Sequence, residues 1–296
     1  MQLLKEWTGV QERIVQKVRR GQLSSRADLL AEEEPLEIKI ASGALDARQY
    51  QSLAITMRTP GQDADLVTGF LFTEGIIARP QQLQAVRHVG QALATTSQDN
   101  VILAELDPST GFDTERFSRH FYTSSSCGVC GKTSIEMVRS VSCYYPRNGF
   151  PKLSDSVLYN LPDRLRHAQS LFEQTGGIHA SGLFTPEGEL VLMREDVGRH
   201  NALDKLIGAA LQQDIFPLRN HIVLVSGRIS FELVQKAAMA GVPLLAAVGA
   251  PSSLAVSLAE EHGMTLVGFL RDGRCNIYHD QNRIQFQAKE IYETSL

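Results

Sequence analysis

The fold class of this chain follows from one stretch of its sequence, HIVLVSGRISFELVQKAAMAGVPLLAAVGAPSSLAVSLAEEHGMTLVGF, which spans residues 221–269. Three uniformly apolar runs predict strands over residues 221–225, 243–248 and 264–269. The segments between them, 230–240 and 252–261, have the spacing of helices. Strands that are apolar on both faces and separated by single helices are typical of βαβ units in a helix-covered sheet. We therefore predict an α/β fold with a three-layer C-terminal domain.

The sequence before this stretch predicts a second, smaller unit. Strands are expected over 36–40, 50–58, 85–89 and 101–106 with a helix over 63–74, so that residues 34–123 form an α+β subdomain. A helix over 163–174, a hairpin of 178–184 with 190–194 and a helix over 199–212 complete the C-terminal domain, residues 133–296. Residues 1–33 are polar and expected to be peripheral, and residues 124–132 are expected to form a mobile loop between the units.

Composition and charge limit the classes of partner. A hydrophobic fraction of 43% and a charged fraction of 21% are ordinary for a globular protein with a sizeable core. The net charge of −4 argues against a nucleic-acid partner, so any anion site must be a local patch. The N-terminus lacks the apolar core of a signal peptide, and the longest apolar run, residues 242–248, is too short to cross a bilayer. We expect a cytoplasmic protein that binds neither nucleic acid nor membrane.

An isolated CxxC pair, Cys127 and Cys130, stands within the sequence SSSCGVCGK. A structural zinc ion needs four ligands, and the remaining cysteines, Cys143 and Cys275, stand alone. A thioredoxin-like site would place the pair at a helix start after a strand, whereas serines precede it here. The flanking glycines favour a mobile loop, so that a thiol on it can move between two partners. This mobility indicates a sulfur carrier that holds the sulfur as a persulfide. Lys132 is close enough in sequence to stabilise the anionic sulfur. A zinc site and a surface loop without function are the alternatives.

A second motif, GGIHASGLF, places His179 after a glycine pair. Zinc deaminases place a histidine similarly, followed two residues later by a glutamate and then by a CxxC. Here Ser181 replaces the glutamate and the CxxC precedes the histidine, so the acid–base group of that reaction is missing. The sequence excludes deaminase activity but is compatible with a related fold. The alternative to a functional His179 is a histidine that only forms a hydrogen bond within a strand.

A third motif, REDVGRHNALDK, gathers polar groups where a strand is expected to give way to a helix. Backbone N–H groups at that junction, with Arg199 and His200, are suited to bind an anion. Asp204 follows His200 by four residues and is expected to orient it from the same helical face. A capped helix with ordinary surface charges is the alternative.

Small or charged residues also follow the predicted strands of the α/β domain. Ser226, Gly227 and Arg228 follow the first, and a similar run of small residues, 248–253, follows the second. The last predicted strand ends with Phe269, Leu270, Arg271, Asp272, Gly273 and Arg274. Because α/β sheets bind ligands at the carboxyl ends of their strands, this rim is expected to bind a bulky polyanionic nucleotide. Neither a Rossmann fingerprint nor a P-loop motif is present.

Together these blocks resemble the formate dehydrogenase accessory sulfurtransferase family, FdhD. The resemblance runs from about Glu34 to near the C-terminus and also includes the blocks MRTPGQDADLVTGFLFTEGII, VSGRISFELVQKAAMAGVPLL, GAPSSLA and GFLRDGRCNIY. Several such blocks in one order are far more specific than any single block.

The resemblance implies a role in sulfur transfer. Family members take sulfur from a cysteine desulfurase and deliver it to the molybdenum of the bis-molybdopterin guanine dinucleotide cofactor of formate dehydrogenase. The persulfide cysteine of the family corresponds to Cys127, and its cofactor-contact segment corresponds to residues 269–274. The resemblance also implies a C-terminal domain of the cytidine-deaminase type and a homodimer. A cofactor-binding chaperone that moves no sulfur is the alternative.

Overall fold

The computed structural model describes residues 9–90, 100–110 and 144–286 of the chain. The predicted mobile loop, with Cys127 and Cys130, lies outside these residues. Cys143 lies outside them as well, whereas Cys275 is half-buried in a strand.

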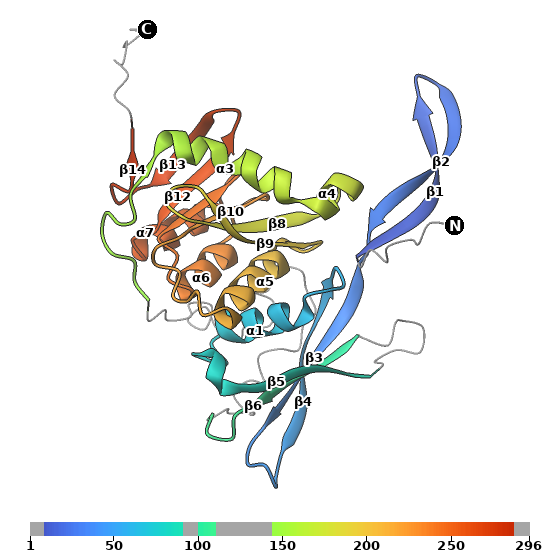
Figure 1. Cartoon of the computed structure of the whole chain (residues 1–296), viewed down its shortest axis with the longest axis vertical. Helices are drawn as coiled ribbons and strands as arrows, with labels where there is room; N and C mark the ends of the chain where they lie inside the picture. The colour runs from blue at the N-terminus through green and yellow to red at the C-terminus, as the bar shows by residue number, and fades with distance from the viewer. Residues whose placement is uncertain (1–8, 91–99, 111–143, 287–296) are drawn as a thin grey trace.

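A six-stranded mixed sheet forms the centre of the C-terminal half (Figure 1). In spatial order its strands are β13 (Arg274–His279), β12 (Thr265–Arg271), β11 (Leu244–Ala247), β10 (Ile222–Val225), β8 (His179–Phe184) and β9 (Leu190–Asp196). Strands β10, β11 and β12 are parallel, and β8, β9 and β13 each pair antiparallel with a neighbour. Helix α6 (Phe231–Met239) connects β10 to β11, and helix α7 (Ser253–Glu261) connects β11 to β12. The predicted alternation of strands and helices is confirmed.

Helices cover both faces of this sheet because its central strands are apolar on both sides. Leu224 of β10 belongs to a hydrophobic cluster with Leu161 of helix α3 (Asp155–Ala168). The neighbouring Val223 points to the opposite face and belongs to a second cluster with helices α5 (Arg199–Gln212), α6 and α7. The α/β class is therefore confirmed, while the resemblance to cytidine deaminases stays a prediction.

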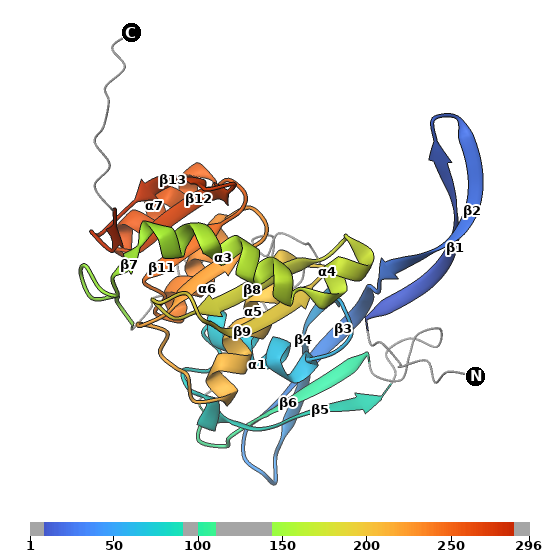
Figure 2. The ribbon, with the colours of Figure 1, turned by 45° about the horizontal axis from the view of Figure 1, so that its top comes forward.

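A second sheet comes from the first third of the chain. Its spatial order is β4 (Gln49–Arg58), β3 (Glu34–Ser42), β6 (Val101–Leu106) and β5 (Leu83–Gly90), and a short 3-10 turn, Pro80–Gln82, precedes β5. Helix α1 (Asp63–Thr73) lies between this sheet and helix α5 (Figures 1 and 2). Leu36 of the sheet, Leu66 of α1 and Leu203 of α5 belong to one continuous hydrophobic cluster. The two halves of the chain thus share a core.

Two glycines allow helices α1 and α5 to cross at very short range. A β-carbon on Gly69 of α1 would lie 1.9 Å from the backbone oxygen of Asp204. A β-carbon on Gly208 of α5 would lie 1.9 Å from the backbone oxygen of Asp65. Since no side chain fits at either position, this crossing depends on both glycines.

Residues 10–31 form a long hairpin, here called the arm. Its strands, β1 (Val10–Arg19) and β2 (Gln22–Ala31), pair antiparallel and turn at Arg20 and Gly21, which have positive φ angles of 49° and 80°. Figures 1 and 2 show the arm projecting from the body of the molecule. The sequence analysis assigned no strands to this segment, because charges interspersed with the apolar residues hide the strand pattern.

The helix predicted over residues 163–174 begins earlier and is interrupted. Helix α3 starts at Asp155, where Ser154 Oγ accepts a hydrogen bond from the N–H of Val157, and a shorter helix, α4 (Ser170–Thr175), follows it. Proline is typical of a first helical position, but Pro162 lies inside α3. The predicted start of the helix, residue 163, is therefore too late in the chain.

The strand predicted over residues 264–269 is also not the last. Strand β12 runs on to Arg271, turns at Asp272 and Gly273, whose φ angles are 52° and 68°, and returns as β13. Beyond it, β14 (Ile284–Gln285) pairs in parallel with β7 (Leu153–Ser154). The predicted rim segment 269–274 is consequently the tip of a hairpin at one side of the sheet.

Candidate functional site

The carboxyl edge of the parallel strands collects most of the predicted site residues. Ser226, Gly227 and Arg228 follow β10 directly at this edge. Since β8 is antiparallel to β10, with Ser181 opposite Val225, the first residue of β8, His179, lies at the same edge. The end of β9 lies there too, because Asp196 is opposite His179, and the chain then enters α5 at Arg199.

Close contacts at Gly227 and Gly249 connect these segments. A β-carbon on Gly227 would lie 3.2 Å from Nδ1 of His179 and 3.9 Å from Cδ of Arg199. The N–H of Gly249, after β11, donates to the oxygen of Gly227 at 3.1 Å, and the N–H of Phe269 donates to the oxygen of Gly249 at 3.0 Å. One line of contacts therefore runs from Arg199 and His179 to Phe269 across the sheet edge.

Arg199 and His179 give this edge an unusual polar character. The Nε atom of Arg199 is buried and has no hydrogen-bond partner among the residues that the structure describes. Burial lowers the pKa of His179, and the positive charge of Arg199 acts in the same direction. The pair thus offers a neutral imidazole beside a guanidinium nitrogen that lacks an acceptor, which suits an anionic or polar ligand.

His200 has partners that the sequence analysis did not identify. Its Nε2 atom lies 2.9 Å from Oε2 of Glu232 and 3.1 Å from the hydroxyl of Ser230, both at the start of helix α6. The prediction that Asp204 orients His200 is wrong, since Asp204 pairs with Lys236 at 2.9 Å. The only sequence signal for Glu232 is its position in the first turn of a helix that opens at the same edge.

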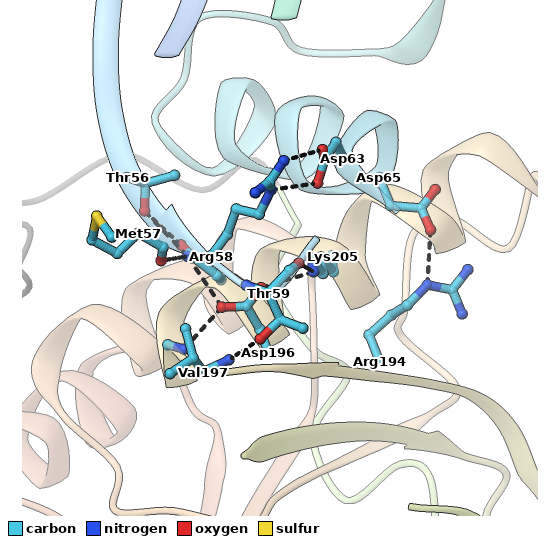
Figure 3. Close-up of polar contacts among 12 residues, drawn as sticks. Thr56, Met57, Arg58, Thr59, Asp63, Asp65, Arg194, Asp196, Val197 and Lys205 are labelled. Carbon is cyan, nitrogen blue, oxygen red and sulfur yellow. Dashed lines mark hydrogen bonds and ion pairs between the residues drawn. The ribbon is translucent and has the colours of Figure 1, made fainter. Parts of the chain in front are cut away.

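Much of the REDVGRHNALDK motif is structural rather than open to a ligand. Figure 3 shows Asp196 and Lys205 in a fully buried ion pair at 2.7 Å. Asp196 also accepts a hydrogen bond from the N–H of Thr59, and Lys205 donates to the oxygen of Thr59 at 2.8 Å. Asn201 donates to the oxygen of Met57 at 2.8 Å. The three hydrogen bonds to Met57 and Thr59 join the end of strand β4 to the end of β9 and to α5. The motif therefore divides into a structural part and a part at the sheet edge.

Further ion pairs fix helix α1 in place. Arg58 is buried and donates through two nitrogens to the carboxylate of Asp63, at 3.1 and 3.0 Å. Arg194 of β9 contacts Asp65 at 2.8 Å (Figure 3). The acids in the first turn of α1 therefore serve as ion-pair partners, in addition to the favourable interaction of acidic side chains with a helix N-terminus.

A buried cluster around Lys236 joins α1, α5 and α6. Lys236 contacts Asp204 at 2.9 Å and Glu74 at 3.3 Å, and the hydroxyl of Thr73 donates to Asp204 at 2.8 Å. Burial acts to lower the pKa of Lys236, but the two carboxylates outweigh it and raise that pKa above its ordinary value. The cluster holds charged partners together inside the core, away from the sheet edge.

The predicted segment 269–274 presents a mixed surface. Phe269 and Arg271 are exposed, as are Asp272, Gly273 and Arg274 at the hairpin turn. Leu270 is fully buried and packs in the cluster beneath α3, so its side chain cannot reach the rim. Phe269 adopts a φ of 53°, which directs its backbone N–H to Gly249 and leaves its ring exposed.

The described residues contain neither a cluster of metal-binding side chains nor a helix suited to span a membrane. No group of three or more His, Cys, Asp and Glu side chains within residues 9–90, 100–110 and 144–286 is arranged to hold a metal ion. None of the helices in those ranges is long and apolar enough to cross a membrane.

Comparisons with known proteins cover most of the chain. The sequence model of the FdhD/NarQ family matches residues 31–285. The "Sulfur carrier protein FdhD" of Streptomyces avermitilis is 49% identical over 280 residues, which are 94% of this chain and 96% of that protein. The protein of the same name from Mycobacterium tuberculosis is 46% identical over 276 residues, 92% of this chain and 97% of its own length.

A solved structure gives the same fold at lower sequence similarity. The crystal structure of a proposed formate dehydrogenase accessory protein from Desulfotalea psychrophila superposes with a TM-score of 0.69 at 23% identity, and the match covers 93% of this chain and 99% of that one. Because the family match covers most of the chain and several relatives exceed 45% identity over nine-tenths of it, this protein belongs to the FdhD/NarQ family.

Proposed function

We propose that this chain is a sulfurtransferase that serves formate dehydrogenase in the cytoplasm. The supporting observation is the match, at 49% identity over 94% of the chain, with a protein named as a sulfur carrier. In this proposal the chain accepts sulfur from a cysteine desulfurase and transfers it to the molybdenum of a bis-molybdopterin guanine dinucleotide cofactor, which it handles as a substrate.

Cys127 and Cys130 carry the chemistry in this proposal. The thiolate of Cys127 attacks the outer sulfur of a desulfurase persulfide, so that a new S–S bond forms on Cys127 and the donor cysteine leaves as a thiolate. The thiolate of Cys130 then attacks the Sγ atom of Cys127. This step forms a disulfide between the two cysteines and releases the outer sulfur as sulfide, which becomes a ligand of the metal. The two cysteines supply the two electrons, and an external dithiol restores them.

The sheet edge is proposed to hold the nucleotide parts of that substrate. Arg199 supplies a buried Nε without an acceptor and His179 a neutral ring, so each can bind a polar group of the ligand. Exposed Arg228, Arg271 and Arg274 are suited to phosphates, and the exposed ring of Phe269 is suited to stack on a guanine. His200, Ser226 and Gly227 complete the proposed cofactor-binding set, together with the backbone of residues 270, 272 and 273. The domain that carries them is proposed to be of the cytidine-deaminase type, and the active form to be a homodimer.

Mass spectrometry of the protein after incubation with a cysteine desulfurase and free cysteine tests the transfer step. We expect persulfide on the peptide with Cys127, and none there in Cys127→Ala. Cys275→Ala is the matched control, since Cys275 is half-buried in β13 and its burial raises the thiol pKa, which opposes nucleophilic attack. A persulfide confined to Cys275 or Cys143 would contradict the proposal.

The second candidate function is a cofactor-binding chaperone that moves no sulfur. It draws support from the same edge residues, because a nucleotide site alone explains Arg199 and Gly227. The candidates differ in cells that lack the native protein. The Cys127→Ala, Cys130→Ala double variant restores formate dehydrogenase activity if the chain is only a chaperone and fails to restore it if the chain transfers sulfur.

A further inference from the structure

Glu232, in the first turn of helix α6, has one carboxylate oxygen without a hydrogen-bond partner. Its Oε2 atom contacts Nε2 of His200 at 2.9 Å. Its Oε1 atom is buried, and no residue in the described part of the chain donates to it. Burying an acceptor without a donor costs free energy, so a native protein keeps few such atoms. Oε1 is therefore an acceptor that a bound ligand can satisfy.

Contacts from two helices hold this carboxylate in place. The side chains of Glu232 and His200 are only 13% and 16% exposed. The same Nε2 atom of His200 lies 3.1 Å from the hydroxyl of Ser230, the N-cap residue of α6. These contacts fix the direction of the Glu232 carboxylate before a ligand arrives. A pre-organised acceptor loses little conformational entropy on binding, which favours a role in recognition.

Two more buried polar atoms of this kind belong to the same edge of the sheet. Arg199 precedes His200 at the start of α5, and its buried Nε lacks an acceptor within the described ranges. The hydroxyl of Ser181 is likewise buried without a partner among the described residues. Ser181 shares one face of β8 with Leu183, which belongs to the hydrophobic cluster of α5 and α6. Of the seven buried side-chain atoms without a partner in the described residues, three thus belong to the adjoining β8, α5 and α6.

The negative charge of Glu232 distinguishes this part of the edge from the part suited to phosphates. A carboxylate repels a phosphate, and it only accepts hydrogen bonds. The group of the ligand that meets Glu232 must therefore be free of negative charge and must carry N–H or O–H donors. The exposed arginines of the rim, Arg228, Arg271 and Arg274, remain for the phosphates.

We propose that Glu232 is a specificity-determining residue that recognises the edge of a 2-amino-oxo ring. Guanine presents a ring N–H and an amino group side by side at this edge, and a pterin presents the same pair. Both oxygens of Glu232 can accept from such a pair, because each carboxylate oxygen has two lone pairs. The buried Nε–H of Arg199 is suited to the neighbouring carbonyl oxygen of the ring. The inference rests on the proposed function, in which the substrate contains both rings.

Calorimetry of the full chain with guanosine, inosine and adenosine diphosphates tests this recognition. Inosine diphosphate lacks the amino group, so it is expected to bind about tenfold more weakly than guanosine diphosphate through the loss of one hydrogen bond to a charged acceptor. Adenosine diphosphate is expected to bind about a hundredfold more weakly, since its ring nitrogen directs a lone pair at the carboxylate and its C–H replaces the amino group.

The variant Glu232→Gln keeps the shape of the side chain and removes its charge. It is expected to reduce the preference for guanosine over adenosine diphosphate by at least about tenfold, because a neutral amide accepts more weakly from guanine and can donate to adenine. Glu187→Gln is the matched control. Glu187 is exposed in the turn between β8 and β9, at the opposite end of these strands from His179. It is expected to leave all three affinities unchanged.

A second pair of ligands distinguishes the two sources of the ring. Pterin carries the amino group, whereas lumazine, its dioxo analogue, has an oxygen in that place. If Glu232 meets the pterin of the substrate, the native chain prefers pterin to lumazine and Glu232→Gln removes that preference. If Glu232 meets guanine, the loss of preference is confined to the nucleotides. Either result supports the proposal.

Three results overturn the proposal. An equal loss of affinity for all three nucleotides in Glu232→Gln would assign Glu232 to the ribose or to the fold. Unchanged preferences among nucleotides and pteridines in that variant would remove Glu232 from recognition, and a native chain that binds neither guanosine diphosphate nor pterin would do the same. Circular dichroism and thermal unfolding verify that the variants fold. The persulfide assay needs none of these ligands, so persulfide on Cys127 in Glu232→Gln separates failure of this inference from failure of the sulfurtransferase proposal.

Discussion

Gly69 of α1 and Gly208 of α5 face each other across the helix crossing, and a β-carbon on Gly208 would lie 2.7 Å from the backbone nitrogen of Gly69. The obstructing atoms belong to the backbones of both helices, so a new methyl group cannot be accommodated by rotating a side chain. The helices would have to separate along their whole contact.

Substitution at this crossing is expected to destabilise the protein strongly. Gly208→Ala should lower the free energy of unfolding by about 3 kcal/mol, at the upper end of the usual cost of overpacking. Denaturant unfolding followed by circular dichroism measures it. Gly75→Ala is the matched control, since a β-carbon there meets no atom within 4 Å and carries only the backbone strain of a φ of 73°. That control is expected to cost about 1 kcal/mol, and equal losses in both variants would contradict the prediction.

Gly227→Ala is expected to impair ligand binding more than stability. Its β-carbon would lie 3.2 Å from Nδ1 of His179, so the ring must shift by a few tenths of an ångström. We expect guanosine diphosphate, a fragment of the proposed substrate, to bind about tenfold more weakly by calorimetry, equal to ~1.4 kcal/mol. Gly177→Ala is the control, because the nearest atom to its β-carbon is 3.9 Å away. Unchanged affinity in Gly227→Ala would remove His179 from the proposed site.

The buried ion pair of Asp196 with Lys205 predicts a marked asymmetry between variants. Lys205→Met leaves the fully buried Asp196 without its counter-ion and should cost about 3–5 kcal/mol of unfolding free energy. The double variant Lys205→Met, Asp196→Asn should cost less than the single one, because no buried charge then stays unpaired. Lys39→Met, in the half-exposed pair with Glu37 at 3.7 Å, serves as control and should change stability by at most about 1 kcal/mol. A double variant less stable than Lys205→Met would refute this account.

The lowered pKa values of two buried histidines predict that the free energy of unfolding decreases at acidic pH. Burial lowers the pKa values of His179 and His221 below the ordinary value of about 6.5. Between each lowered pKa and 6.5 the unfolded chain binds more protons than the folded one, so the free energy of unfolding falls as the pH decreases through that window. Urea unfolding at pH 7.5 and pH 5.5 measures the effect. His221→Asn should reduce the difference between the two pH values, whereas His167→Asn, at an exposed position on α3, should leave it unchanged.

The alternating strands and helices from α5 to β12 follow closely from the sequence because their apolar runs have the lengths and spacings of βαβ units. The helix predicted over residues 199–212 has those bounds in the structure. The local sequence pattern was misleading for two elements whose secondary structure depends on contacts with residues distant in sequence. Pro162 lies within a helix that packs Leu161 and Leu165 on the sheet, and the arm has strand pairing despite its interspersed charges.

The location of the candidate site could be predicted from the sequence, but the hydrogen-bond and ion-pair partners of its side chains could not. Strand order places Ser226, Gly227 and the ends of β8 and β9 at one edge, and a predicted α/β sheet already implies such an edge. The partners of His200 and Asp204 could not be read from helical spacing, because each bonds to a residue of α6 about thirty positions away. A buried polar side chain selects its partner by tertiary contact, which periodicity does not encode.

The position of α1 between the four-stranded sheet and α5 bears on how the chain is made. During synthesis the first hundred residues leave the ribosome well before residue 199, where α5 begins. Until then the face of α1 that carries Gly69 has nothing to pack against, and the nascent N-terminal half cannot complete its core. The N-terminal half can therefore bury this face only after chain growth has passed through α5.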